Sequence, residues 1–169
     1  MDRTLITLAI YASILTTNVN ALSNLQLHCP GLTVTMAHSE VNNLPSAHVV
    51  ARCRNTAEEP VNSRLDLNWC LSWAENQHAF VPKTLGNAFV DAQCYDCKTM
   101  RDVRWFPSSI SRRAGPDDLL CFCKPNHQYQ ATEHRTGVPT RKSTFDLNRV
   151  LSVRDDGRIG CFEHTGTEF

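Results

Sequence analysis

Ser63-Arg64-Leu65-Asp66-Leu67-Asn68 is the stretch of this chain that decides the fold, because a near copy, Ser143-Thr144-Phe145-Asp146-Leu147-Asn148, stands eighty positions further on. Each copy is followed three residues later by a leucine, Leu71 or Leu151. A repeat of this length is longer than a solenoid unit, yet half of this chain would hardly bury enough apolar surface alone. The chain is therefore predicted to be one unit written twice, as two half-domains that share a core.

The amino terminus has the pattern of a secretory signal peptide. Arg3 precedes an apolar run over residues 5–15, and polar residues then lead to Val19-Asn20-Ala21, which fits a small-residue cleavage site. The run is shorter than the roughly 20 apolar residues that a membrane helix needs, and no second apolar span follows. We expect residues 1–21 to be a signal peptide and residues 22–169 to be one secreted domain without a membrane span. Its repeats would cover about 22–83 and 84–165.

Cysteine content and charge narrow the class of protein. The chain has eight cysteines, all after residue 21, and an even number in an exported chain favours disulfides. The alternative is a zinc site in which Cys94-x-x-Cys97 and Cys121-x-Cys123 supply four thiolates. Lys plus Arg number 17, as do Asp plus Glu, so the chain lacks the excess basic charge expected of a nucleic-acid-binding protein. No nucleic-acid partner is expected.

Two stretches of the first unit alternate apolar and polar residues, which is the period of half-buried strands. The apolar positions are Leu25, Leu27, Leu32 and Val34 in one stretch, and Val49, Ala51 and Cys53 in the other. In each copy of the repeated motif a short strand is expected to end at the asparagine, Asn68 or Asn148, because asparagine tolerates turn geometry.

A hairpin is predicted after each copy of the motif. In the second unit Arg154-Asp155-Asp156-Gly157 stands between the apolar stretches 150–153 and 158–162, and Asp-Gly in this setting is a strong hairpin signal. In the first unit Asn76 takes the place of Gly157, since asparagine also visits the left-handed region, and the turn is one residue shorter. Each half is thus predicted to be three strands and a hairpin, with polar inserts over 101–118 and 127–142.

Together these residues resemble the cyanovirin-N homology family, in particular its cysteine-rich secreted forms from filamentous fungi. A cysteine in the first strand, another in the second, the Ser-x-hydrophobic-Asp-Leu-Asn stretch and a hairpin with an acidic turn all occur twice. The resemblance covers nearly the whole chain after residue 21. It implies an all-β fold of two pseudo-symmetric repeats, in which each three-stranded sheet packs against the hairpin of the other repeat. A monomer or a domain-swapped dimer is expected. The apolar hairpin residues that would be buried against the other repeat's sheet are Leu71, Trp73, Phe80, Leu151, Val153, Ile159 and Phe162.

The resemblance also implies two disulfides that join the first two strands of each half, Cys29 with Cys53 and Cys94 with Cys123. For the other four cysteines we favour Cys97 with Cys121 inside the second sheet and Cys70 with Cys161 between the hairpins. Strand alternation leaves these two pairs open, because it places Cys121 and Cys123 on one face but Cys94 and Cys97 on opposite faces.

The best-known activity of the family is the binding of mannose-rich oligosaccharides without catalysis. The resemblance implies one pocket in each half, made by the first strand, the turn after the second strand and the exchanged hairpin. The more polar pocket would use Gly86, Asn87, Asp91, Gln93, Lys124, Asn126, Gln128, Ser72 and Glu75. The other would use Asn24, His28, Arg54, Thr56, Arg154, Asp155 and Asp156. Because the two hairpin turns differ, one pocket is expected to dominate.

Catalysis is not predicted. The seven histidines are scattered, without a pair at ligand spacing on a helix. Asp155-Asp156 is interpreted as an acidic turn and not as the paired carboxylates of a glycosidase. No cofactor or metal is expected. Trp73 stands where the family has an asparagine, and both core packing and stacking on a sugar ring stay open. The alternative function is a secreted interaction or effector protein that binds protein partners on the same scaffold.

Overall fold

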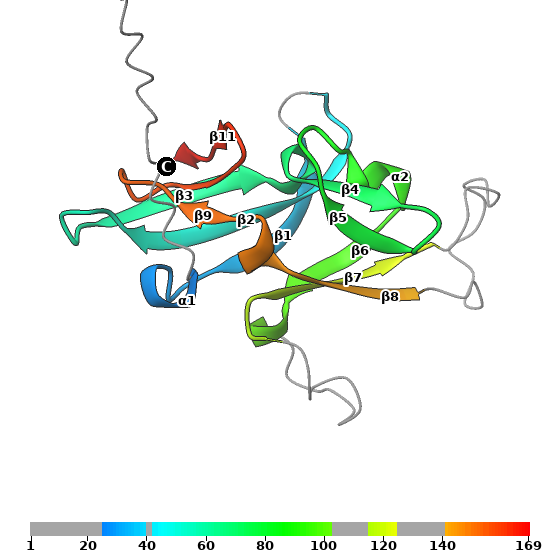
Figure 1. Ribbon diagram of the computed structural model, residues 1–169, viewed down its shortest axis with the longest axis horizontal. Coiled ribbons are helices and arrows are strands. Elements are labelled where there is room, and N and C mark those ends of the chain that lie inside the picture. Colours follow the sequence, from blue (N-terminus) through cyan, green and yellow to red (C-terminus); the bar gives the residue numbers. More distant parts are fainter. Residues whose placement is uncertain (1–24, 40–41, 103–114, 125–140) are drawn as a thin grey trace, which may run out of the picture.

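The computed structural model describes residues 25–39, 42–102, 115–124 and 141–169, so the predicted signal peptide and most of both inserts lie outside it. This part is mostly antiparallel β-structure with single helical turns, which confirms the all-β prediction (Figure 1). None of the helices within these ranges is long and apolar enough to cross a membrane. In chain order the elements are α1 (Leu25–His28), β1 (Thr33–His38), β2 (Pro45–Arg54), β3 (Pro60–Asp66), η1 (Leu67–Trp69), β4 (Leu71–Ala74), β5 (Ala79–Pro82), α2 (Ala88–Asp91), β6 (Tyr95–Thr99), η2 (Met100–Asp102), β7 (Asp118–Cys123), β8 (Arg141–Asp146), η3 (Leu147–Arg149), β9 (Ser152–Val153), β10 (Ile159–Cys161), β11 (His164–Thr165) and β12 (Thr167–Glu168).

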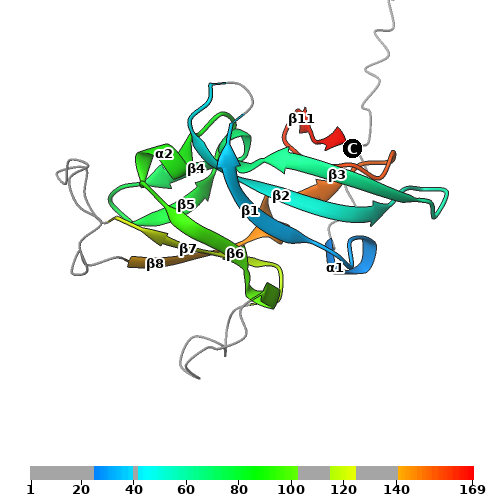
Figure 2. The same ribbon diagram turned by 180° about the vertical axis from the view of Figure 1, so that it is seen from behind.

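Each half presents a three-stranded antiparallel sheet, then a 3-10 turn, then a hairpin. The sheets are β1-β2-β3, to which β12 adds a fourth strand, and β6-β7-β8. The β4-β5 hairpin of the first half contacts β8 and α2 of the second. In return β10 contacts β3, and β9 contacts α1 (Figures 1 and 2). Each hairpin therefore lies against elements of the other half.

The two halves share one hydrophobic core. Along β2 the side chains of Ala47, Val49, Ala51 and Cys53 are buried, whereas Arg52 and Arg54 on the opposite face are exposed, as the period of two predicts. The core cluster contains buried residues from both sheets and both hairpins, among them Leu65, Leu67, Leu71, Phe89, Leu119, Leu147, Leu151, Val153 and Ile159.

The repeated motif forms the same local structure twice. β3 ends at Asp66 and β8 at Asp146, and each aspartate caps a 3-10 turn by accepting a hydrogen bond from the backbone N–H of the asparagine two residues on. These bonds measure 2.9 Å to Asn68 and 3.0 Å to Asn148. The strands thus end two residues before the predicted position, and each asparagine lies within the 3-10 turn without a positive φ. The aspartate starts the turn.

The side chain of each motif asparagine accepts a hydrogen bond from the backbone of a short helix elsewhere in the chain. Asn68 Oδ1 accepts a hydrogen bond from Phe89 N in α2 at 3.3 Å, and Asn148 Oδ1 accepts one from Leu25 N in α1 at 3.2 Å. The first N–H groups of a helix have no partner within it, so these side chains satisfy buried donors. Because Asn148 belongs to the second half and Leu25 to the first, the latter bond links the two halves.

The expected first strand of each half is partly helical. Leu25 and Leu27 lie in α1, where Leu25 is fully buried and Leu27 is 72% exposed. Residues 86–93, expected in the first strand of the second half, contain α2, and β6 begins only at Tyr95. A helical turn of four residues is too short to leave a periodic pattern, so alternation alone mistook it for a strand.

Both predicted hairpins are present, and the first turn, residues 75–78, is one residue shorter than the second, residues 154–158. Gly157 has φ +85°, and a side chain there would stand 2.9 Å from Val61. In the first turn His78 and not Asn76 has the positive φ, so that prediction is wrong. Phe162, expected in the core, is 46% exposed because it follows β10 in a turn of its own.

The four disulfides are Cys29–Cys53, Cys70–Cys161, Cys94–Cys123 and Cys97–Cys121, the same pairs as those given above. Three of them connect neighbouring segments of one half, whereas Cys70–Cys161 joins the end of η1 to β10 and so bridges the halves. All eight sulfurs are bonded, so the four thiolates of the zinc alternative do not exist in this structure.

A β-bulge explains how Cys94 and Cys97 both reach β7. The β6-β7 register shifts between Tyr95 and Lys98, where Asp96 has φ 47°. Two residues of β6 then oppose one of β7, which turns Cys97 toward the face that carries Cys121. Simple alternation, which placed Cys94 and Cys97 on opposite faces, fails at this bulge.

Asp118 and Asp146 face each other across β7 and β8. Burial and the negative charges of Asp146 and Asp117 raise the pKa of Asp118. When a carboxyl has a higher pKa in the folded than in the unfolded chain, the free energy of unfolding falls as the pH rises through the interval between the two pKa values. Asp118→Asn should therefore raise the melting temperature at pH 7 by about 1–3 °C more than at pH 3. Equal shifts at both pH values, measured by calorimetry, would contradict this assignment.

Candidate functional site

The structure brings together part of the more polar predicted pocket. Ser72 of β4 and Asn87 form an isolated antiparallel bridge. Gly86 lies so close to β4 that a Cβ atom would stand 2.3 Å from a backbone oxygen. Lys124 donates its backbone N–H to the oxygen of Ala92 at 3.1 Å, which places it beside the end of α2. These contacts hold the backbone of the predicted pocket.

In the described part of the chain, the polar side chains of this predicted pocket are not linked to one another by hydrogen bonds or ion pairs. Asp91 and Gln93 are exposed near α2, and Glu75 is exposed in the β4-β5 turn. Within the described part of the chain, no side-chain hydrogen bond or ion pair links Glu75 with Asn87 or Lys124. Asn126 and Gln128 lie outside the described residues.

Trp73 belongs to the core. Its side chain is 9% exposed and meets the ring of Phe80 edge to face, with the centroids 5.3 Å apart and the planes at 78°. This geometry agrees with the packing interpretation of Trp73 and not with stacking on a sugar ring.

The other predicted pocket is assembled from two turns. Thr56, between β2 and β3, donates its N–H and its Oγ1 to the backbone oxygen of Asp155, between β9 and β10, at 3.1 and 3.3 Å. His28 is half-buried at the end of α1, and Asn24 lies outside the described residues. The carbonyl of Asp155 thus joins the two turns, and its side chain is exposed.

Two charged residues of this pocket already have partners. Asp156 accepts hydrogen bonds from Arg158, at 3.0 Å from N and 2.7 Å from Nε. Partial burial alone would raise the pKa of Asp156, but the hydrogen bonds and positive charge of Arg158 outweigh it and hold this pKa below its ordinary value. Arg154 Nη2 donates to the carbonyls of Phe162 and His164. The side chains of Asp156 and Arg154 therefore form hydrogen bonds within the β9-β10 hairpin and the segment that follows it.

A groove of about 330 Å³ lies at the end of β2 and the turn into β3, on the side of the exposed Arg52 and Arg54. Its volume is within the range of about 300–1,000 Å³ usual for small-ligand sites. We call it the arginine groove, and it is lined by Pro30, Arg52, Cys53, Arg54, Glu58 and Pro60. Arg54 pairs with Pro60 in the β2-β3 register, and Glu58 belongs to the turn that joins the two strands.

Polar contacts fix two parts of the groove wall. Arg54 Nη1 lies 3.0 Å from Glu58 Oε2, and both side chains are mostly exposed. Arg101 Nη1 donates to the carbonyl of Pro30 at 3.0 Å, while its Nη2 lies 2.8 Å from Oδ1 of the buried Asp117. The Pro30 side of the groove is thereby anchored to the second half of the chain.

Of the lining residues only Arg54 was included in the predicted pockets. The sequence does indicate a second arginine on the same face, because Arg52 and Arg54 stand two positions apart on either side of the inward-facing Cys53, as expected in a strand. The disulfide from Cys53 to Cys29 then places Pro30 next to them. The resemblance instead implies a pocket at Thr56 and the β9-β10 turn.

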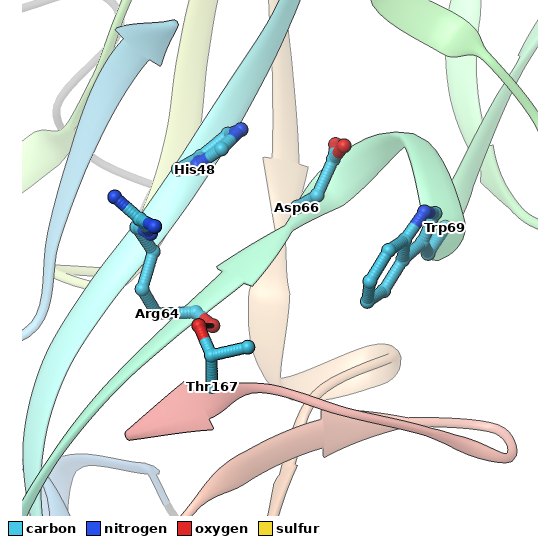
Figure 3. A pocket seen from close by; sticks show the side chains of 5 residues that line it. All are labelled: His48, Arg64, Asp66, Trp69 and Thr167. Atoms are coloured by element: carbon cyan, nitrogen blue, oxygen red, sulfur yellow. Dashed lines mark hydrogen bonds between the residues drawn. The ribbon is translucent and has the colours of Figure 1, made fainter. Parts of the chain in front are cut away.

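A much smaller cavity lies further along the same face of the sheet, between His48, Arg64, Asp66, Trp69 and Thr167 (Figure 3). Its volume of about 10 Å³ is close to the minimum for a single water molecule, so it is too small for a sugar. His48 pairs with Asp66 in the β2-β3 register, and their buried Nε2 and Oδ2 atoms have no hydrogen-bond partner in the described structure. This cavity is a small buried polar site within the scaffold.

In comparisons with known proteins, no family model matches the chain, and no curated protein matches it.

Proposed function

We propose that this protein binds carbohydrate without catalysing a reaction, on a scaffold of the cyanovirin-N type. Two observations support the scaffold. The motif asparagines, Asn68 and Asn148, make equivalent bonds to Phe89 and Leu25, as expected of two related repeats. In addition, each hairpin contacts the sheet or helix of the other half.

The observation that carries the proposal is the arginine groove. It lies where β2 ends, beside the segment after α1 and at the turn into β3, and it shares Arg54 with one of the pockets that the resemblance implies. Arg52, Arg54 and Glu58 supply hydrogen-bond donors and acceptors that match sugar hydroxyls. The rings of Pro30 and Pro60 supply apolar surface for the C–H face of a sugar ring.

The lining of the groove suits binding better than hydrolysis. A glycosidase needs two carboxyl groups on either side of the scissile bond. The arginine groove is lined by one, Glu58, and this carboxylate is paired with Arg54. We therefore propose a lectin.

A glycan array tests this proposal. The purified protein is expected to bind at least one class of glycan, and Arg52→Ala and Arg54→Ala should each weaken that binding about tenfold or more, because each removes a hydrogen-bonding group of the groove. Glu75→Ala and Asn87→Ala, in the other predicted pocket, are the matched controls and should bind as the unaltered protein does.

Two results would count against it. Loss of binding in Glu75→Ala or Asn87→Ala, with the groove variants unaffected, would move the site to the other pocket. Absence of signal with every glycan would contradict carbohydrate binding and favour a protein-interaction role on this scaffold.

A further inference from the structure

The lining of the arginine groove carries more positive than negative charge. Arg52 and Arg54 face a single carboxylate, Glu58. Arg54 and Glu58 offset each other through their 3.0 Å pair. The side chain of Arg52 makes no hydrogen bond or ion pair with any residue that the structure describes. One guanidinium in the groove is therefore left without a counter-charge.

Arg52 is well placed to meet a ligand. Its backbone is held by β3, where it pairs with Asn62, just beyond the end of the β1-β2 pairing at Val50, while its side chain is exposed. A group that projects from a strand is positioned more precisely than one on a loop. The guanidinium is a planar fork that donates two parallel N–H groups to a carboxylate or to a sulfate.

Strand pairing extends this basic surface. Arg64 of β3 is opposite Val50, the residue two positions before Arg52, so Arg52, Arg54 and Arg64 share one face of the sheet. The chain as a whole has equal numbers of acidic and basic residues. The gathering of arginines is thus local, and it follows from the β2-β3 register and not from overall composition.

From these observations we infer that the arginine groove selects sugars that carry an anionic group, a carboxylate or a sulfate, over neutral mannose-type oligosaccharides. The anionic group would accept two hydrogen bonds from Arg52, and the sugar ring would lie against Pro30 and Pro60. This inference rests on the proposed function, since it requires that the groove binds sugar.

Isothermal titration calorimetry on the whole protein tests the inference with three trisaccharides of similar size: trigalacturonate, a sulfated trisaccharide and neutral mannotriose. At least one of the two acidic sugars should bind about tenfold or more tightly than mannotriose, and the tighter one identifies the anionic group. Arg52→Gln should weaken acidic-sugar binding about ten- to hundredfold, because charge-assisted hydrogen bonds are lost, and should weaken mannotriose binding less, by about two- to fivefold, because only a contact to a hydroxyl is lost. Arg52→Lys should fall in between, since it keeps the charge without the fork.

Lys83→Gln is the matched control, because it removes one exposed positive charge that does not line the groove, and it should change no affinity by more than about twofold. The unaltered protein provides a test that needs no variant: raising the salt from 50 to 500 mM should weaken acidic-sugar binding alone. Mannotriose binding as tight as or tighter than that of both acidic sugars would overturn the inference and leave carbohydrate binding standing. No binding of any sugar, here or on the array, would overturn both.

Discussion

Removing the disulfide between the two halves, by Cys70→Ala with Cys161→Ala, is expected to lower the free energy of unfolding by about 4 kcal/mol. This bridge joins residues 91 positions apart, the longest separation of the four. A cross-link stabilises mainly by restricting the unfolded chain, and the restriction grows with the length of the loop that it closes. It also holds together halves that share one core.

The chain offers a matched control for this experiment. Cys97–Cys121 lies inside the loop that Cys94–Cys123 already closes, so removing it frees far less of the unfolded chain. Cys97→Ala with Cys121→Ala should cost about 2 kcal/mol. Both pairs are buried, so the loss of packing is comparable. Guanidinium unfolding without reductant measures both values, and equal costs or the reverse order would contradict this account.

Asp66→Ala is expected to lower the free energy of unfolding by about 2–4 kcal/mol, because two buried donors lose their acceptor. Asp66 is 4% exposed, and its Oδ1 accepts hydrogen bonds from Ser46 Oγ and from Asn68 N. Asp146, its counterpart in the second copy, is exposed and, among the residues that the structure describes, accepts hydrogen bonds only from Asn148.

The duplication supplies the control for this second experiment. Asp146→Ala removes the same cap at an exposed position and should cost about 1 kcal/mol. Asp66→Asn keeps an oxygen in place of Oδ1 and should recover most of the loss. Denaturant unfolding of the three variants tests this order, and a cost for Asp146→Ala as large as that for Asp66→Ala would show that burial does not matter here.

The sequence predicted those parts of the fold that depend on local chemistry. Asp156-Gly157 marked its hairpin because the turn needs a positive φ, and the alternation of Val49, Ala51 and Cys53 marked a half-buried strand. The Asp-Leu-Asn stretch correctly located the end of a sheet. It did not reveal that the aspartate caps the turn and that the asparagine reaches a distant helix, because the second contact depends on the tertiary fold.

Features that depend on long-range pairing escaped prediction for the same reason. β12 has two residues and no pattern of its own, and it is a strand only because Thr167 pairs with Arg64. All lining residues of the arginine groove except Pro30 lie in the continuous stretch 52–60, where Arg52 and Arg54 flank Cys53. Pro30 joins them only through the Cys29–Cys53 disulfide, and Arg64 joins the basic face only through the β2-β3 register, so the complete surface depends on long-range pairing.

The most direct test of the central claim, that sugar binds in the arginine groove, is an NMR titration of the ¹⁵N-labelled protein with the sugar that binds most tightly. We expect the largest shifts at the amides of Arg52, Cys53, Arg54 and Glu58 and at Gly31 beside Pro30. Shifts concentrated instead at Ser72, Asn87, Asp91 and Lys124 would place the sugar in the other predicted pocket and contradict the assignment.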